Sequence, residues 1–261
     1  METKKFQPTL KQINTVYRQS KANGLLTSKT IFDTVTSPKF NELLECTKRQ
    51  VRQVGTPDPI LAKYLAEQGF TLLPTQVSNK EFSILVKSGL AEIYRGVRKD
   101  DAIVDFATNP DMFVGKGIYC NGIYFMYGNT CPDGRHGDTS AKARAERYIQ
   151  MPKDLPNEVL AEYAKSYTKG QVIRALVKKD SRVIEFKALR ALCEKFKLDI
   201  RNDASISDEI KEKLITLISE DLAIVAAMEG FDIIDVPLTK YMIVLNRGKL
   251  IMNKEDVEKS R

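Results

Sequence analysis

The sequence predicts an α+β fold in which a helical first third precedes a region of mixed strands and helices. Three observations favour this class. Apolar residues recur at helical spacing in the first 80 residues, β-prone runs and helical segments alternate irregularly after them, and glycines interrupt the β-prone runs between residues 115 and 129. A doubly wound parallel sheet would instead alternate strands and helices regularly.

Composition narrows the class of protein. Of the 261 residues 43% are hydrophobic and 29% charged, a globular balance. No apolar run is long enough to span a membrane, and the first residues lack the apolar core of a secretory signal. Four cysteines without a CxxC pair and one histidine, His136, argue against a zinc site and against a histidine-based nucleophilic triad. We therefore expect a chain that folds in a reducing cytoplasm.

The positive charge is concentrated in the first third of the chain. Residues 1–80 hold 12 lysines and arginines against six acidic residues, whereas residues 81–261 hold 29 against 28. Such a basic region can bind phosphates or an acidic protein, or can be an ordinary solvated helical surface. Aromatic residues are not interleaved with the basic ones, so nucleic-acid binding through residues 1–80 stays an alternative without a recognised motif.

The elements follow in order. Helical patterns run from Leu10 to Tyr17 and from Phe40 to Val54, and a third begins at Ile60 and stops near Gly69. These make residues 1–80 a basic helical region. A domain over residues 81–252 follows, and residues 253–261 read as a charged, frayed tail.

The second region mixes strands and helices. Asn79 can begin a helix through Val86, a strand from Leu90 runs into Arg95-Gly96, and Ser140 can cap an alanine-rich helix. Further strands are predicted at 171–177, 182–186, 231–236, 241–245 and 249–252, and helices at 187–197, 207–219 and 220–229.

Two segments carry residues suited to binding a nucleotide. Arg95 follows an apolar strand and precedes Gly96, so its planar guanidinium can meet a phosphate or ribose, although a surface arginine would read the same way. The near-duplicates GKGIY (115–119) and NGIYF (121–125) combine glycines, which permit close approach, with tyrosine rings that can stack on a base. A glycine-kinked hairpin with core tyrosines is the alternative.

In their order along the chain these segments resemble the ADP-ribosyltransferase fold, and most closely the ADP-ribosyltransferase-like proteins of tailed bacteriophages. The resemblance covers residues 88–252. It rests on Ile93-Tyr94-Arg95-Gly96, on the paired Gly-Ile-Tyr segments with the following Ser140 helix, and on the segments GFDIIDV (230–236) and YMIVLNRG (241–248).

This resemblance implies a split mixed or antiparallel sheet and NAD as a substrate, with no metal. Arg95 would hold the dinucleotide, and Tyr124 or Tyr119 would stack on nicotinamide. The remaining cofactor-binding positions it implies are Gly96, Asn121 and Gly122. Many proteins of this group are associated with the phage head or packaged in the virion. The implied location is therefore the virion, the cytoplasm of the bacterial host, or both.

One element of the family pattern is absent. These transferases place a glutamate beside the last long strand, where its charge stabilises the oxocarbenium-like transition state as nicotinamide leaves. The aligned positions here are Thr239, Lys240 and Met242. Asp235 is the candidate substitute, if the turn at Pro237 brings it back to the site; Glu229 and Asp232 are the other nearby acids.

Two functions follow from the resemblance. The first is an NAD-dependent ADP-ribosyltransferase that modifies a host protein, with Arg95, Tyr124 and Asp235 as its site. The second is a catalytically silent virion component that keeps the fold and docks onto capsid, portal or cargo through residues 1–80. Whether the chain is an active enzyme depends on the missing glutamate.

Overall fold

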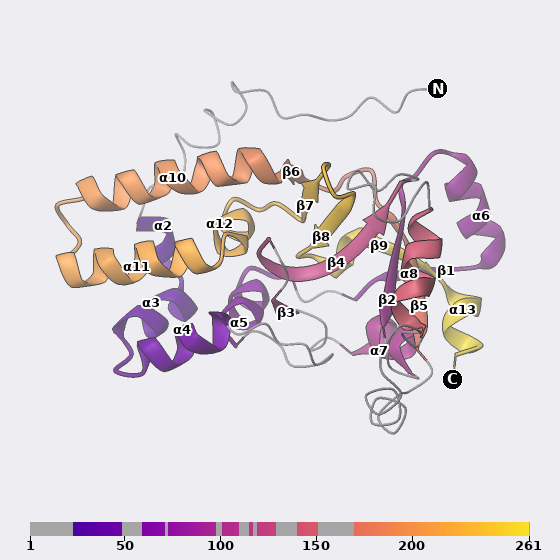
Figure 1. The fold of residues 1–261 in the computed structure, drawn as a ribbon, viewed down its shortest axis with the longest axis horizontal. Helices are drawn as coiled ribbons and strands as arrows, with labels where there is room; N and C mark the ends of the chain where they lie inside the picture. The colour runs from indigo at the N-terminus through magenta and orange to yellow at the C-terminus, as the bar shows by residue number, and fades with distance from the viewer. Residues whose placement is uncertain are drawn as a thin grey trace, which may run out of the picture.

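The computed structural model describes residues 23–48, 59–70, 73–97, 101–109, 115–116, 119–128, 140–150 and 170–260. These residues form an α+β fold around one mixed sheet, as predicted (Figure 1). Eight strands follow the order β1-β9-β5-β2-β4-β8-β7-β6, and β3 pairs with β4 outside this order. The β1–β9 and β6–β7 pairs are parallel, and the other pairs are antiparallel.

The elements of the first half end with the alanine-rich helix. The helices are α2 (Asn23–Thr27), α3 (Lys29–Thr36), α4 (Phe40–Lys48), α5 (Pro59–Glu67), α6 (Asn79–Lys87), α7 (Ala102–Thr108) and α8 (Ala141–Ile149). The strands are β1 (Thr75–Val77), β2 (Glu92–Val97), β3 (Gly115–Lys116) and β4 (Asn121–Tyr127).

The second half supplies the longest helices and the remaining strands. The helices are α10 (Phe186–Asn202), α11 (Asp208–Glu220), α12 (Ala223–Met228) and α13 (Lys254–Glu258), with a 3₁₀ turn η1 at Arg247–Lys249. The strands are β5 (Gln171–Val177), β6 (Val183–Glu185), β7 (Ile233–Val236), β8 (Tyr241–Val244) and β9 (Leu250–Asn253).

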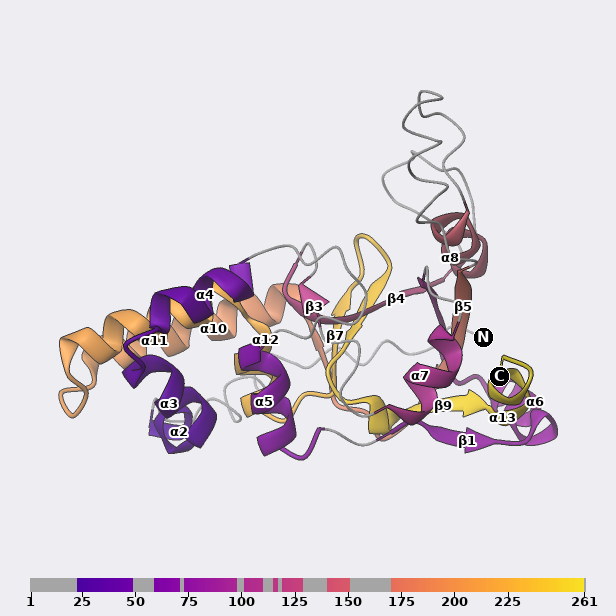
Figure 2. The same ribbon diagram turned by 90° about the horizontal axis from the view of Figure 1, so that it is seen from below.

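Helices cover both faces of the sheet. On one face, helices α2 to α5 and α10 to α12 pack together and onto β6, β7 and β8, with Ile234 and Ile243 in that core (Figures 1 and 2). We call this the α10 face. On the other, the α7 face, Phe106 of α7 packs edge-on against Phe125 of β4. Because side chains alternate along a strand, Tyr124 belongs to the α10 face and Phe125 to the α7 face.

The N-terminal helices are not a separate body. Leu25, Ile31 and Leu61 lie in the same apolar cluster as Leu189 of α10 and Ile234 of β7. The predicted boundary near residue 80 also cuts through the sheet, because β1, within the region expected to be helical, pairs with β9. A three-residue strand at a sheet edge carries too little periodicity to stand out in the sequence.

Most predicted elements of residues 81–252 are present. Ser140 caps α8 by accepting a hydrogen bond from the Ala143 amide at 3.2 Å, and the strand over 171–177 has the predicted bounds. The strand beginning after Leu90 extends through Arg95-Gly96 to Val97. Helices α2, α3 and α7 were not predicted. The predicted helix at residues 10–17 and the end of the one at 40–54 lie outside the described residues.

The prediction of a frayed C-terminal tail is wrong. Residues 254–258 form α13, which contacts α7, and its Val257 is buried in the α7-face cluster. Asn253 caps this helix by accepting a hydrogen bond from the Glu255 amide at 3.0 Å. One apolar side chain among charged neighbours gives little sequence signal, yet it is enough to dock a short helix on an existing core.

This docking can be tested with Val257→Ala. We expect the variant to lose about 2 kcal/mol of unfolding free energy, because the buried methyls leave a cavity between α13 and α7. Urea denaturation measures the loss. Glu258→Ala, one residue along the same helix, should leave the free energy of unfolding within about 0.5 kcal/mol of wild type. Equal effects for the two variants would contradict the docked helix.

Candidate functional site

The sheet opens where β2 and β4 part. These strands share only two register pairs, Ile93 with Tyr127 and Tyr94 with Met126, whereas β2 and β5 stay paired over six residues. Immediately after the last shared pair, the Arg95 Nη1 donates a hydrogen bond to the Tyr124 carbonyl at 3.0 Å. The guanidinium therefore bridges the two strands at the point where their backbone ladder stops.

Arg95 is a partly desolvated cation in this opening. Its Nε is buried and has no hydrogen-bond partner among the described residues, and no carboxylate there forms an ion pair with it. Burial lowers the pKa of Arg95 to about 10, so the side chain is still cationic at neutral pH. A charge with buried, unbonded donors destabilises the folded protein unless an anion binds to those donors.

Tyr124 is held by its own hairpin. Its hydroxyl accepts hydrogen bonds from the amides of Tyr119 and Cys120 at 3.0 Å each, and donates one to the Cys120 carbonyl at 2.7 Å. Burial and the nearby Cys120 thiol raise the pKa of the Tyr124 phenol, so it stays protonated. These three hydrogen bonds fix the position of the Tyr124 ring and occupy its hydroxyl group.

An aromatic cluster surrounds Tyr124 on the α10 face. The ring of Tyr241 packs edge-on against Tyr124, with centroids 5.9 Å apart. Tyr119 packs in the same way against Phe186 at 5.1 Å, and its hydroxyl donates to the Thr239 Oγ1 at 3.1 Å. Both predicted stacking tyrosines therefore lie near one another, on the side of the sheet that the long helices cover.

The glycines at the site are required by the packing itself. A Cβ on Gly96 would collide with the Ala145 carbonyl, because α8 lies directly on β2. Gly122 has φ +142°, and a Cβ there would collide with the Ile243 side chain of β8. Each contact explains its glycine without a ligand, so the predicted role of these two positions in cofactor binding stays a prediction.

Asp235 lies on the opposite face from Tyr124. It pairs in register with Met242, which follows Phe125 on the α7 face, and its Oδ1 accepts a hydrogen bond from the Tyr127 hydroxyl at 2.6 Å. The turn after Val236 does not bring this carboxylate round to the stacking tyrosines. The other two nearby acids, Glu229 and Asp232, are buried.

None of the three positions aligned with the glutamate supplies a carboxylate, and each has its own contact. The Thr239 hydroxyl accepts a hydrogen bond from the Tyr119 hydroxyl. The Lys240 Nζ lies 5.7 Å from the centroid of the Tyr127 ring, and Met242 is on the α7 face. On β8, Ile243 is the register partner of Tyr124, and the ring of Tyr241 packs edge-on against the Tyr124 ring. The alternation of β8 gives this result once the register with β4 is known.

Asn121, at the start of β4, is fully buried. Its backbone amide and its Nδ2 donate to the two carboxylate oxygens of Asp221, at 3.3 and 3.0 Å. Asp221 lies between α11 and α12, where it also accepts from the Ala223 amide at 3.1 Å. Sequence reasoning missed Asp221, since a residue 100 positions away gives no local signal of the contact.

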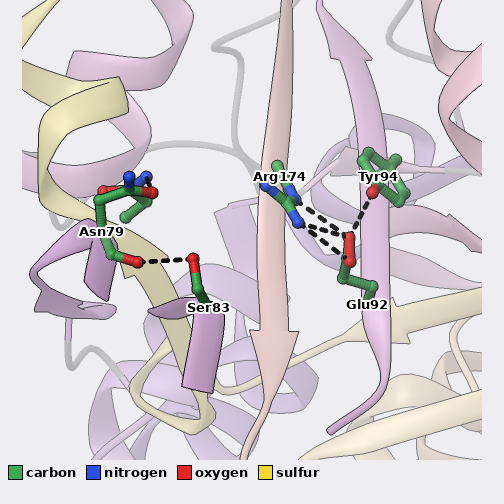
Figure 3. Close-up of polar contacts among 6 residues, drawn as sticks. Asn79, Ser83, Glu92, Tyr94 and Arg174 are labelled. Carbon is green, nitrogen blue, oxygen red and sulfur yellow. Dashed lines mark hydrogen bonds and ion pairs between the residues drawn. The ribbon is translucent and has the colours of Figure 1, made fainter. Parts of the chain in front are cut away.

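A second polar network joins β2 to β5 (Figure 3). Its β2 residues, Glu92 and Tyr94, alternate with Arg95 along the strand and so lie on the other face. Arg174 of β5 grips the Glu92 carboxylate through Nε and Nη2 at 3.0 Å each, and the Tyr94 hydroxyl donates to the same carboxylate. The guanidinium also lies 4.8 Å from the Phe82 ring centroid. Its polar groups are satisfied by one another, so we regard it as a structural link between β2, β5 and α6.

This network makes stability depend on pH. Burial raises the pKa of Glu92, but hydrogen bonds from Arg174 and Tyr94 outweigh burial and hold it below its usual value. A carboxyl whose folded pKa is lowered contributes stability that is present above its unfolded pKa, about 4.3, and lost as pH falls through the folded value. We expect the free-energy difference between wild type and Glu92→Gln to shrink below about pH 4. Urea denaturation from pH 3 to 7 measures it, and a constant difference would contradict the link.

The structure also bears on metals and membranes. In the described part of the chain, no three His, Cys, Asp or Glu side chains are grouped so as to hold a metal ion. The helices described there are too short or too polar to cross a bilayer.

Comparisons with protein-family models, with curated proteins and with solved structures give no match to this chain. Functional inference therefore rests on the residues themselves.

Several predicted site residues are neighbours in the fold, although their side chains lie on both faces of the sheet. Arg95 is bonded to Tyr124, Tyr124 is bonded to Tyr119, and Asn121 and Gly122 begin the same strand. Gly96 follows Arg95 in β2 and lies under α8. By alternation the Arg95 side chain shares the α7 face with Asp235, whereas the rings of Tyr119 and Tyr124 lie on the α10 face.

Proposed function

We propose that this chain is an ADP-ribosyltransferase-like protein that binds NAD where β2 and β4 part and cleaves its bond between nicotinamide and ribose. The observation that carries the proposal is Arg95, a half-buried guanidinium whose Nε is buried and which has no carboxylate partner among the described residues. A pyrophosphate is the kind of anion that a planar guanidinium recognises well.

The neighbouring residues fit the rest of the dinucleotide. Tyr119 and Tyr124 provide aromatic rings on the α10 face, and Tyr124 is held rigidly by three hydrogen bonds. The Arg95 side chain alternates onto the α7 face with Ile93 and Val97, and it reaches Tyr124 at the backbone carbonyl. Flat aromatic rings stack on nicotinamide or adenine. The short pairing of β2 with β4 leaves the Arg95 guanidinium at the point where the two strands part.

The reaction breaks the bond between the nicotinamide nitrogen and the ribose carbon C1′. Nicotinamide leaves with the bonding electrons, positive charge develops on the ribose, and a nucleophile of the acceptor attacks C1′ and loses its proton. With water as acceptor the product is ADP-ribose. We propose a host protein as the acceptor and the host cytoplasm as the place of reaction.

A second candidate is a catalytically silent component of a phage virion. It is favoured by the residue that touches Tyr124 from β8, which is Tyr241 and not an acid, and by the position of Asp235 on the other face. In that case the positive charge of residues 1–80 would serve to dock the protein on acidic virion proteins or on packaged nucleic acid.

The test is NAD binding and nicotinamide release by the purified chain, with and without host lysate. Binding with release that increases when lysate is added supports the transferase. Binding without release supports the silent component. A folded chain that does not bind NAD at millimolar concentration would refute both the site and the proposed activity.

A further inference from the structure

The Asp221 carboxylate is a buried acidic group between the sheet and the helical layer. It is fully buried, and it accepts hydrogen bonds from the Asn121 amide, the Asn121 Nδ2 and the Ala223 amide. These three donors come from the start of β4 and the first turn of α12. The carboxylate thus joins the sheet strand that bears Tyr124 to the helical layer.

Asn121 is the first residue of β4, at the turn end of the β3–β4 hairpin, where it pairs with Lys116. The two residues before it, Tyr119 and Cys120, supply both backbone amides that donate to the Tyr124 hydroxyl. Cys120 and Asn121 are buried, and the Asn121 Oδ1 has no hydrogen-bond partner within the described residues.

We infer that Asp221 is a positioning residue: through Asn121 it fixes the hairpin of residues 119–124 and so sets where the Tyr119 and Tyr124 rings lie. The inference rests on the proposed function for its consequence, a defined stacking surface for nicotinamide. The link to hairpin geometry can be measured without NAD.

The chain contains a matched control. Asp232 is also a buried carboxylate bound to an asparagine, since its Oδ1 accepts from the Asn246 Nδ2 at 2.8 Å. Its Oδ2 accepts from the Arg182 amide at 2.8 Å. This pair ties β7 to the segments after β8 and before β6, and neither of these two bonds involves residues 119–124. Asp232→Asn therefore reproduces the chemistry of Asp221→Asn at another place.

The first readout is alkylation of the Cys120 thiol by iodoacetamide in the full chain, located by peptide mass. A buried thiol reacts only when its surroundings open. We expect Asp221→Asn to speed Cys120 labelling about tenfold, which corresponds to about 1.4 kcal/mol of lost hairpin stability. Asp232→Asn should leave the Cys120 rate unchanged. Equal acceleration by both variants would overturn the inference, because it would indicate general loosening.

Two further variants guard against misfolding and test the pairing. Asn121→Ala keeps the backbone bond to Asp221 and should give a smaller acceleration in the same direction. The exchange Asn121→Asp with Asp221→Asn restores an amide–carboxylate pair and should return labelling toward the wild-type rate. If the exchange labels as fast as Asp221→Asn alone, the pair does not hold the hairpin.

The second readout is the Kd for NAD. Asp221→Asn should weaken binding about tenfold relative to Asp232→Asn at equal fractions of folded protein. If wild type binds NAD but both variants bind equally, the positioning role is refuted and the proposed function stands. If wild type does not bind NAD, the proposed function fails, and Cys120 labelling alone decides what Asp221 does.

Discussion

Arg95→Ala should weaken NAD binding about a hundredfold, which is the loss expected when a charged, partly desolvated donor to a phosphate is removed. The guanidinium bridges β2 and β4 at the Tyr124 carbonyl, and its Nε has no partner among the described residues. The anion would be the group that uses the remaining donors. Isothermal titration with NAD measures the change.

Two controls separate the ligand from the scaffold. Arg95→Lys keeps the charge but loses the planar fork, so it should recover only part of the affinity. Arg174→Ala removes an arginine of the neighbouring strand whose register partner is Tyr94, so its side chain is on the opposite face of the sheet from Arg95. That variant should bind NAD like wild type. A loss as large as that of Arg95→Ala would show that any damage to β2 and β5 abolishes binding.

Tyr241→Glu should increase nicotinamide release about a hundredfold over wild type, because one well-placed electrostatic group in an active site contributes a factor of this order. Tyr241 is the β8 residue in contact with Tyr124, so a carboxylate there would lie beside the stacking ring. It would accept a hydrogen bond from a ribose hydroxyl and stabilise the positive charge that develops as nicotinamide leaves. Nicotinamide is measured by chromatography at saturating NAD.

The matched controls concern the charge and the face of the sheet. Tyr241→Gln has nearly the same shape as the glutamate variant without the charge, and should not exceed wild type. Met242→Glu places the same carboxylate one residue along, on the α7 face with Asp235, and should also give no gain. Increased release from Met242→Glu would contradict the geometry, whereas no gain from Tyr241→Glu in a folded variant that binds NAD would contradict the proposed chemistry.

The sequence predicts a helix or strand correctly where the residues of that element themselves carry a cap or an apolar pattern. Ser140 before an alanine-rich run predicts the capped helix α8, and the apolar run over 171–177 predicts β5, since capping and burial act within a few residues. The same reasoning did not find α7 or the docking of α13. Both depend on a core to which residues far away in the chain contribute.

For the site, the sequence placed Arg95 and the two tyrosines in candidate segments but could not say which face each would occupy. The pairing of β4 with β8 and of β8 with β7 decides that Tyr124 and Asp235 are on opposite sides. A shift of either register by one residue would reverse this result, because side chains alternate along a strand.

The sequence by itself determined the α+β class, most of the helices and strands of residues 81–252, and the candidacy of Arg95, Tyr119 and Tyr124, because propensity, caps and glycine spacing are local properties. Only the tertiary structure decided that Arg95 stands where β2 and β4 part, that Tyr241 meets Tyr124, and that Asp221 holds Asn121. These contacts join residues separated by up to 117 positions. They follow from sheet register and helix packing, which the whole chain sets together.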